Sequence, residues 1–396
     1  MTASDPIVIV GAARTPMGGF QGDFANLTSP ELGGAAIKEA LSRAGVKGDE
    51  VDEVVMGIVL PAGVGQAPAR QASAAAGIPW DKGCTTINKM CGSGMKATMF
   101  AHDAILAGSN DIMVAGGMES MTNAPYLMEK ARGGFRMGHG KVMDHMFLDG
   151  LEDAYDKGRL MGTFAEETAQ HYQFTREEQD NFAITSLKRA QEAITSGESA
   201  KEIVPVTIKT RKGETVVDQD EQPMKANLNK IPTLKPAFAK DGTVTAANSS
   251  SISDGGAALV LMRQSEAEKR GLTPIAKICG HSTEAREPQW FTTAPVGSIE
   301  KVLAKVGWSK DDVDLYEINE AFAVVTMVAM RDLDLPHDKV NVFGGACALG
   351  HPIGASGARI LVTLMNALKS KGGTKGVASL CIGGGEATAV ALELMS

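Results

Sequence analysis

Two cysteines, a histidine and an asparagine stand in four short segments that are far apart in the chain. These segments are 88–94 (NKMCGSG), 319–323 (NEAFA), 350–352 (GHP) and 381–385 (CIGGG). A thiol is a nucleophile once deprotonated, an imidazole exchanges protons near neutral pH, and an amide can stabilise an oxyanion. Together the four segments predict a cysteine-based acyl-transfer site.

Cys91 has the sequence context that best fits a nucleophile. It stands at a predicted turn with Gly92 and Gly94, just before a predicted helix over 95–106. The positive end of the helix dipole favours a thiolate there, and Gly92 would let a substrate carbonyl approach the backbone amides. The alternative is an ordinary buried free cysteine.

His351, Cys381 and Asn319 are each ambiguous alone. His351 lies in a glycine-rich loop before a helix expected to start near Ser356, where it could exchange protons with a thiol or be a hydrogen-bonded loop histidine. Cys381 ends an apolar strand and could be a small core residue. Asn319 joins an apolar strand to a helix-like segment, where it could orient a water or an oxyanion, cap the helix, or do both.

The two ends of the chain resemble each other. A helical pattern ending at Gly45 recurs at an offset of 262 (307 − 45), ending at Gly307. The sequence SGMK at 93–96 recurs as SGAR at 356–359, at an offset of 263 (356 − 93). We infer an internal duplication. The matching strand-like runs are 54–58 with 315–318 and 112–117 with 378–384, which makes Val114 the image of Cys381.

The duplication also reveals an insertion near 123–242, which contains an amphipathic helix near 176–195. The predicted domains are therefore a first half (1–122 and 243–272), an inserted loop domain (123–242) and a second half (273–396). Alternating strands and helices predict mixed, mainly parallel sheets covered by helices. Long excursions tend to serve binding or assembly.

Composition limits the function classes. A formal net charge of −8 argues against nucleic-acid or membrane-surface binding. Five cysteines without CxxC spacing favour free thiols in a reducing compartment over disulfides or a metal site. No secretory signal or membrane span is apparent, so we expect a cytoplasmic protein. The glycine clusters match neither a P-loop nor a complete dinucleotide-binding fingerprint.

With these motifs the chain resembles the thiolase family over nearly all of its length. Further matching segments are 11–16 (GAARTP), 116–121 (GGMESM) and 350–359 (GHPIGASGAR). The resemblance implies two βαβαβαββ halves in a five-layered αβαβα core with an inserted loop domain. It also implies acetyl-CoA C-acetyltransferase activity, which interconverts two acetyl-CoA with acetoacetyl-CoA and CoA by a ping-pong mechanism.

By this resemblance Cys91 accepts the acyl group and His351 activates it. Cys381 would remove a proton from the methyl group of a second acetyl-CoA. Asn319 would hold a water that stabilises the enolate-like oxygen together with His351. The backbone amides of Cys91 and Gly383 would form the oxyanion hole for the acyl thioester.

The resemblance also implies contacts with coenzyme A and acetyl-CoA, which are substrates, and neither a tightly bound cofactor nor a metal. Lys225 is a candidate phosphate contact, and Met161 would line the acyl pocket. Core packing is the alternative for Met161 and Phe238. The predicted substrate-binding residues are Leu160, Met161, Lys225, Phe238, Ala246, Ser250, Phe291 and Phe322.

Some positions depart from the family pattern. Leu160 stands where many acetoacetyl-specific members have histidine, and Phe291 where some have methionine. These changes keep open a 3-ketoacyl-CoA thiolase acting on longer or 2-methyl-branched substrates. Cys347 and Glu386 are also unusual, but neither removes a catalytic group.

Other readings of the chain are more distant. Acyl-carrier-protein condensing enzymes share the fold but would lack the Cys381 segment, and a non-catalytic acyl-CoA-binding protein would not need all four reactive residues. The family resemblance implies a homo-oligomer, either a dimer or a tetramer. We expect the tetramer contacts in the Gly/Met-rich stretch 133–150.

Overall fold

The first half of the fold is assembled from residues on both sides of the insertion. The structure is a computed structural model that describes residues 5–211 and 213–395. The predicted helix ends at Gly45, whose φ of 67° lies in the left-handed region that favours glycine. The elements of this half are β1 (Ile7–Arg14), β2 (Gly18–Gly19), α1 (Ser29–Ala44), β3 (Glu53–Gly57), α2 (Pro68–Ala75), β4 (Gly83–Ile87), α3 (Ser93–Leu106), β5 (Ile112–Ser120), β10 (Ser253–Arg263) and α7 (Gln264–Lys269).

The second half repeats the order of the main elements, although its described residues form no counterpart of β2, β4 or α7. Its outer helix ends at Gly307 with a φ of 71°, as the duplication predicts. The elements are β11 (Ala276–Ala285), α8 (Ala294–Val306), β12 (Leu315–Ile318), α9 (Ala323–Asp332), α10 (Ala346–Leu349), α11 (Ile353–Lys371), β13 (Lys375–Ile382) and β14 (Glu386–Leu394).

Strand pairing corrects one detail of the repeat. Glu53 of β3 lies opposite Met113 of β5, and Leu315 of β12 lies opposite Gly376 of β13. The offset therefore stays at 263 (376 − 113) along β13, and the image of Cys381 is Met118 instead of Val114 (381 − 263). Two apolar runs can be slid along each other in sequence, whereas the hydrogen-bonded ladder fixes the register.

The strand order is β12-β13-β14-β11-β1-β10-β5-β3-β4, with β2 paired to β10. The prediction of mainly parallel sheets is wrong. Among the described residues, only the β3–β4, β3–β5 and β12–β13 ladders of this sheet are parallel, and the rest are antiparallel. In the second half a short turn joins β13 to β14, so this pair runs antiparallel. β5 and β10 hold the corresponding places in the first half and are also antiparallel, although the insertion separates them in sequence.

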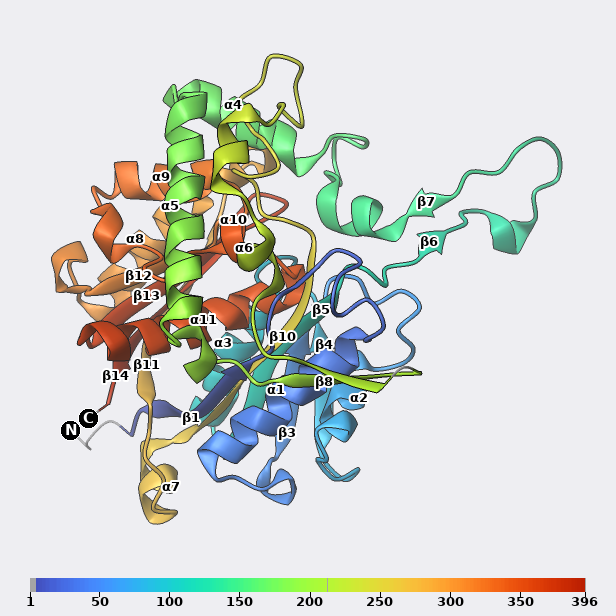
Figure 1. Cartoon of the computed structure of the whole chain (residues 1–396). Coiled ribbons are helices and arrows are strands. Elements are labelled where there is room, and N and C mark those ends of the chain that lie inside the picture. Colours follow the sequence, from blue (N-terminus) through green and yellow to red (C-terminus); the bar gives the residue numbers. More distant parts are fainter. Residues whose placement is uncertain (1–4, 212, 396) are drawn as a thin grey trace.

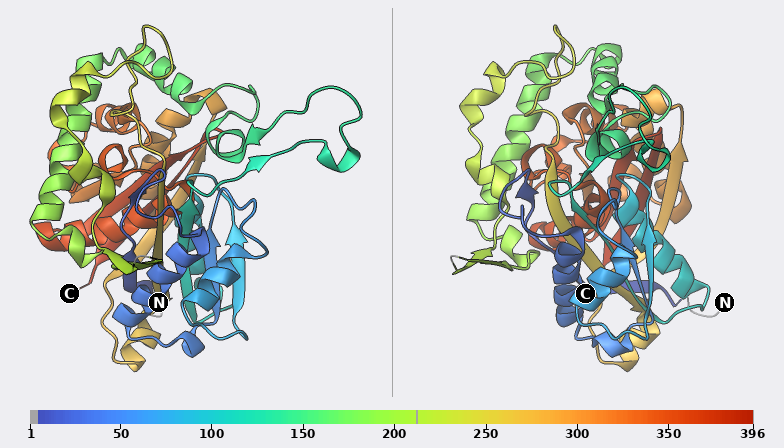
Figure 2. Two further views of the ribbon diagram at one scale, coloured as in Figure 1. Left: turned by 45° about the vertical axis from the view of Figure 1, so that its right-hand side comes forward. Right: turned by 90° about the vertical axis from the view of Figure 1, so that its right-hand side faces the viewer.

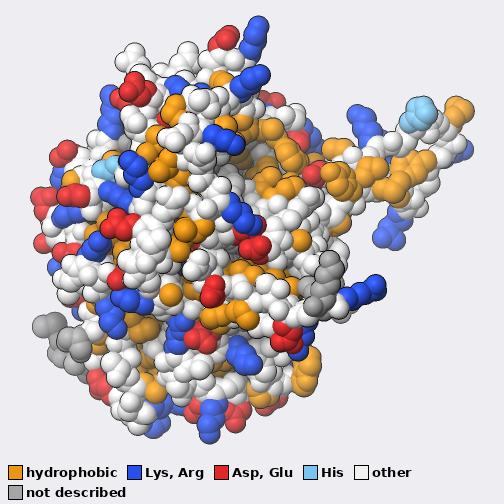
Figure 3. Space-filling view, viewed as in Figure 1, with side chains coloured by type: hydrophobic (Ala, Val, Ile, Leu, Met, Phe, Trp, Pro, Cys, Tyr) orange, Lys and Arg blue, Asp and Glu red, His pale blue; other side chains and the backbone are white. Residues whose placement is uncertain are grey.

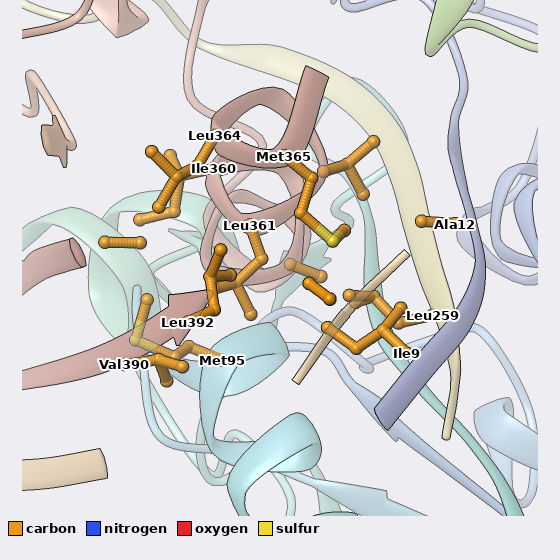
Figure 4. Packing of buried hydrophobic residues seen from close by; sticks show 14 of the residues in the cluster. Ile9, Ala12, Met95, Leu259, Ile360, Leu361, Leu364, Met365, Val390 and Leu392 are labelled. Atoms are coloured by element: carbon orange, nitrogen blue, oxygen red, sulfur yellow. The ribbon is translucent and has the colours of Figure 1, made fainter. Parts of the chain in front are cut away.

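The halves pack in layers around a shared central pair of helices (Figures 1 and 2). α3 and α11 contact each other, and α11 contacts strands of both halves. α1 and α2 cover the outer face of the first half, and α8 covers that of the second. Figure 4 shows the packing of α11 residues such as Leu361 with Met95 of α3, Leu259 of β10 and Leu392 of β14, all buried. The expected five-layered αβαβα arrangement is confirmed.

The insertion wraps one side of this core and extends an arm away from it (Figures 1 and 2). The predicted helix begins and ends at the expected residues, Arg176 and Thr195, and Thr175 and Glu178 form its capping box. None of the described helices is long and apolar enough to cross a membrane. The elements of the insertion are β6 (Tyr126–Leu127), β7 (Met143–Asp144), α4 (Met161–Tyr172), α5 (Arg176–Thr195), β8 (Val206–Thr210), β9 (Gly213–Val217) and α6 (Glu221–Lys225).

Candidate functional site

The crossing of α3 and α11 brings the ends of two distant segments together. A Cβ on Gly94 would lie 2.8 Å from the backbone nitrogen of Ala358, and a Cβ on Gly357 would lie 2.5 Å from that of Met95. Only glycine permits backbones to approach this closely. The repeated Ser-Gly pair therefore marks the crossing point, and the helix N-termini that follow Cys91 and His351 meet there.

Cys91 occupies a tight turn just before α3. Met90 has a φ of 49°, a strained conformation for a residue with a side chain, and Ser93 supports the turn by accepting from the Lys89 amide and donating to the Met90 carbonyl. Burial raises the pKa of the Cys91 thiol to about 11, although the backbone N–H groups of Gly383 and of Cys91 itself lower it. The expected stabilised thiolate is therefore wrong for the resting site, because burial raises the pKa of the thiol more than the positive end of the helix dipole lowers it.

His351 is buried between α10 and α11, and its orientation is fixed. The helix starts three residues before the expected Ser356, at Ile353, so the Ser356 hydroxyl lies in its first turn. That hydroxyl donates to the Pro352 carbonyl at 3.0 Å and lies 2.6 Å from Nδ1 of His351. Nδ1 therefore carries the proton and donates to Ser356, which leaves Nε2 as the basic atom.

The basic nitrogen of His351 is available for proton transfer. Nε2 is buried and has no hydrogen-bond partner within the described chain. Burial, followed by the positive charge of Arg359, lowers the pKa of His351 to about 3. The imidazole is consequently neutral at physiological pH and faces a neutral thiol across the site. Ser356 was missed as a functional residue, although its position five residues after His351 was visible in the sequence.

Cys381 and Gly383 lie at the end of β13 and the start of the turn into β14. Cys381 is fully buried and packs with Phe291 and Phe322. Burial raises the pKa of its thiol well above 9, and a negative charge on Cys91 would add to the rise. The Gly383 amide acts on the Cys91 sulfur, so this turn contributes a hydrogen-bond donor to that thiol.

Asn319 follows β12 and does not cap the next helix. The cap position of α9 is Phe322, and the Ala323 amide donates to the Asn248 carbonyl instead. The Asn319 side chain is buried, and its Oδ1 accepts from Nη2 of Arg359 at 3.4 Å. Its Nδ2 has no partner in the described part of the chain.

A buried hydrogen-bond network supports the loop around Asn319. The Glu320 carboxylate accepts from the Ser186 hydroxyl at 2.7 Å, the Asn341 amide at 2.8 Å and the backbone amide of Cys347 at 3.1 Å. The sequence motif included Glu320 but gave no sign of these partners, because they lie in three other segments. Cys347 therefore helps to hold this loop, and Glu386, the other unusual residue, pairs with Lys89.

One cavity of about 640 Å³ connects the predicted site residues. Cys91, His351 and Gly383 line it, while Asn319 and Cys381 lie behind its wall. Met161 and Phe238 line the cavity and also pack against the neighbouring apolar cluster, so core packing is confirmed and the substrate contact stays a prediction. The predicted substrate-binding residues on the wall are Leu160, Met161, Phe238, Ala246, Ser250, Phe291 and Phe322.

Lys225 is not part of this cavity. It lines a second cavity of about 630 Å³, together with Lys230, and donates to Glu221 at 2.6 Å. The two cavities share Ala246, Ser251 and Ile252 on their walls. The two cavities therefore adjoin at this wall.

A possible cation-binding set lies elsewhere. Among residues 5–211 and 213–395, only His102, Asp103 and His281 bring three metal-type ligand atoms within 4.8 Å of one another. Both imidazoles hydrogen-bond to the same carboxylate oxygen, at 2.9 Å and 2.8 Å. The set is close to the end of α3 remote from Cys91, so it takes no part in the cavity.

Known proteins resemble the chain over its whole length. Residues 7–265 match the family described as thiolase, N-terminal domain, and residues 272–394 match thiolase, C-terminal domain. The chain is 50% identical over 388 residues to an acetyl-CoA acetyltransferase of Rhizobium meliloti, covering 98% of each. It is 49% identical over 393 residues to the cytosolic acetyl-CoA acetyltransferase of Mus musculus, again covering 98% of each. The crystal structure of the Bacillus anthracis acetyl-CoA acetyltransferase superposes with a TM-score of 0.96 at 43% identity, covering all of both chains.

Proposed function

The chain belongs to the thiolase family, and on that premise we propose that it is an acetyl-CoA C-acetyltransferase. It would interconvert two acetyl-CoA with acetoacetyl-CoA and CoA. The full-length relatives named above carry that activity in their names. The observation that supports it most directly is one cavity lined by the Cys91 thiol, the Gly383 turn and a histidine with a free Nε2.

The first half-reaction transfers an acetyl group to Cys91. Because the resting thiol is protonated, Nε2 of His351 accepts its proton as the sulfur attacks the thioester carbonyl. The backbone amides of Gly383 and Cys91 stabilise the oxyanion. The carbon–sulfur bond to CoA then breaks, and the leaving thiolate takes the proton from His351.

The second half-reaction forms the carbon–carbon bond. Cys381 acts in its thiolate form: it removes a methyl proton from a second acetyl-CoA, and the carbanion attacks the acetyl group on Cys91. An acetylated Cys91 cannot ionise, so the negative charge that would add to the raised pKa of Cys381 cannot form at this stage. Asn319 stabilises the enolate oxygen, and His351 does so in the form that carries a proton on Nε2, while the expelled Cys91 thiolate recovers a proton from Cys381.

The two adjoining cavities suit the two ends of coenzyme A. The first has a mainly apolar wall that includes Met161, Phe238 and Phe291, which fits an acyl group and a thiol-bearing arm. The second, with Lys225 and Lys230, is placed for the phosphate-bearing end. Because Lys225 is already paired with Glu221, its contribution to affinity should be small.

The apolar wall of the first cavity also fits a second function, that of a 3-ketoacyl-CoA thiolase acting on longer or branched substrates. Leu160 and Phe291 face the cavity, and an apolar wall accommodates a longer or branched acyl chain. The test is thiolysis with CoA added to acetoacetyl-, 2-methylacetoacetyl- and 3-ketohexanoyl-CoA, with Cys91→Ala as the control. Activity confined to the four-carbon substrate supports the acetoacetyl assignment. Equal or faster rates on the others support a 3-ketoacyl-CoA thiolase, and no Cys91-dependent activity refutes both.

The arm between β6 and β7 is the proposed surface for assembly into a homotetramer. Met137 is 96% exposed and Tyr126 67% exposed, and further apolar side chains lie along the arm (Figure 3). Apolar groups on a projecting arm are stabilised when a second copy covers them. We also propose that the protein acts in the cytoplasm in fatty acid metabolism, with acyl-CoA as substrate and no tightly bound cofactor.

A further inference from the structure

Arg359 is a fully buried cation that none of the catalytic steps above uses. It projects from α11 toward the end of β12 and the residue after it, where Nη1 lies 3.6 Å from a carboxyl oxygen of Glu317 and Nη2 donates to Oδ1 of Asn319 at 3.4 Å. A buried charge is costly unless it has a compensating role or partner. The neighbours of Arg359 indicate such a role.

The guanidinium determines which way the Asn319 amide faces. Arginine has five N–H donors and no acceptor, so only the oxygen of a neighbouring carboxamide can face it. Oδ1 is thereby held at Arg359, and the amide nitrogen must point to the opposite side. There Nδ2 is buried and lacks a partner among the residues described. A buried donor without a partner is expensive, and it is free to bind a group that arrives with the substrate.

We propose that Arg359 is a positioning residue for carbon–carbon bond formation, which holds the Asn319 amide with its N–H donors available to the developing enolate oxygen or its bound water. Without Arg359 the amide can rotate and present Oδ1, a repulsive group, to the same oxygen. The inference rests on the proposed acetyltransferase activity. It concerns only the second half-reaction, because the acyl thioester uses the amides of Cys91 and Gly383.

The duplication supports a specific role for this cation. The image of Arg359 in the first half is Lys96, by the offset of 263 (359 − 96). Lys96 points elsewhere, with its ammonium 4.8 Å from the centre of the Phe100 ring. Both halves thus carry a basic residue at this helical position, but only the second has a guanidinium directed at an asparagine.

Arg359→Met removes the donor while keeping an unbranched side chain, and Arg359→Lys retains the charge. The first assay is exchange of labelled CoA into acetyl-CoA, which requires only acyl transfer to Cys91. The second is full thiolysis of acetoacetyl-CoA. We expect thiolysis by Arg359→Met to fall about 100-fold, as for the loss of one oxyanion donor. Exchange should change less than 5-fold, and Arg359→Lys should recover part of the loss.

The pH profile provides a readout that a purely structural role would not move. The positive charge of Arg359 depresses the pKa of His351, so Arg359→Met should shift the acid limb of kcat/KM to higher pH. Arg14→Met is the matched control, because Arg14 is equally buried and paired with Glu202 and Asp220. It should lower the melting temperature without separating exchange from thiolysis.

A double-mutant cycle with Asn319→Ala decides whether Arg359 acts through the amide. If it does, Arg359→Met has little further effect on thiolysis once Asn319 is alanine. Equal losses in both backgrounds, or equal losses of exchange and thiolysis, would overturn the proposal. If Arg359→Met does not fold, the cycle with Arg359→Lys gives the answer. A wild-type chain that lacks even the exchange reaction would refute the proposed function instead.

Discussion

Gly94→Ala should separate the two central helices and impair the reaction. The new Cβ would lie 2.8 Å from the Ala358 nitrogen and 3.1 Å from the Gly354 oxygen, whereas ordinary contacts begin at 3.4 Å. Both neighbours are backbone atoms that cannot rotate away. The helices must therefore move apart by about 0.6 Å, the difference between 3.4 Å and 2.8 Å.

The shift acts on the distance between Cys91 and His351. Overpacking of this kind costs about 1–3 kcal/mol of folding stability, and a 1 Å misplacement of reacting groups can cost about 100-fold in rate. We expect kcat/KM for acetoacetyl-CoA thiolysis to fall about 10- to 100-fold, measured at a temperature where thermal unfolding shows that the variant is folded.

Gly108→Ala, just beyond the C-terminal end of the same helix, is the matched control. Its φ of 77° strains any residue with a side chain, at about 1–2 kcal/mol, but nothing lies within 4 Å of the new Cβ. It should lose a similar stability and retain activity. If Gly94→Ala keeps as much activity as Gly108→Ala, the helix crossing does not set the geometry of the site.

Four further outcomes are expected. Ser356→Ala leaves the Nδ1 proton of His351 without an acceptor, so kcat should fall about 5- to 150-fold with little change in KM. Steady-state kinetics measure this effect, and Ser356→Thr, which keeps a hydroxyl, should restore activity if the hydrogen bond is the cause. Burial raises the folded-state pKa of Glu317 from 4.5 to about 8, so the folded chain holds a proton that the unfolded chain releases, and stability falls as pH rises through this window. Glu317→Gln should flatten that slope in denaturant titrations between pH 5 and about 8. Lys225→Gln should raise the KM for CoA only a few-fold, and a larger effect would show that Glu221 yields the lysine to the ligand. Met137→Glu should lower the oligomer mass measured by light scattering while thiolysis persists, and an unchanged mass would exclude the arm.

The sequence predicts most elements of the fold because their periodicity and glycine stops are local. The helix Arg176–Thr195 and the strand Leu315–Ile318 have the predicted bounds. Strand direction and the image of Cys381 were wrong, because pairing between distant strands leaves no mark in a single apolar run.

In the candidate site, too, local sequence motifs could be predicted, whereas contacts between distant segments could not. Cys91 and His351 stand in recognisable motifs, and the structure brings them to one cavity. The resting protonation of Cys91 could not be predicted, because desolvation depends on which segments surround the thiol. Ser356 and Arg359 lie in the sequence motif 350–359, but their contacts with His351 and Asn319 appear only in the three-dimensional structure.

The helix crossing also shows that two identical halves could not form this site. By the offset of 263, the image of Cys91 is Gly354 (91 + 263), and the image of His351 is Asn88 (351 − 263). A side chain at Gly354 would collide with Glu119 and with the Met118 carbonyl, both at 2.7 Å. The position that carries the thiol in the first copy, Cys91, must therefore have no side chain at its image in the second copy, Gly354. The chemistry depends on broken symmetry, and only a chain in which the two copies can vary independently can encode it.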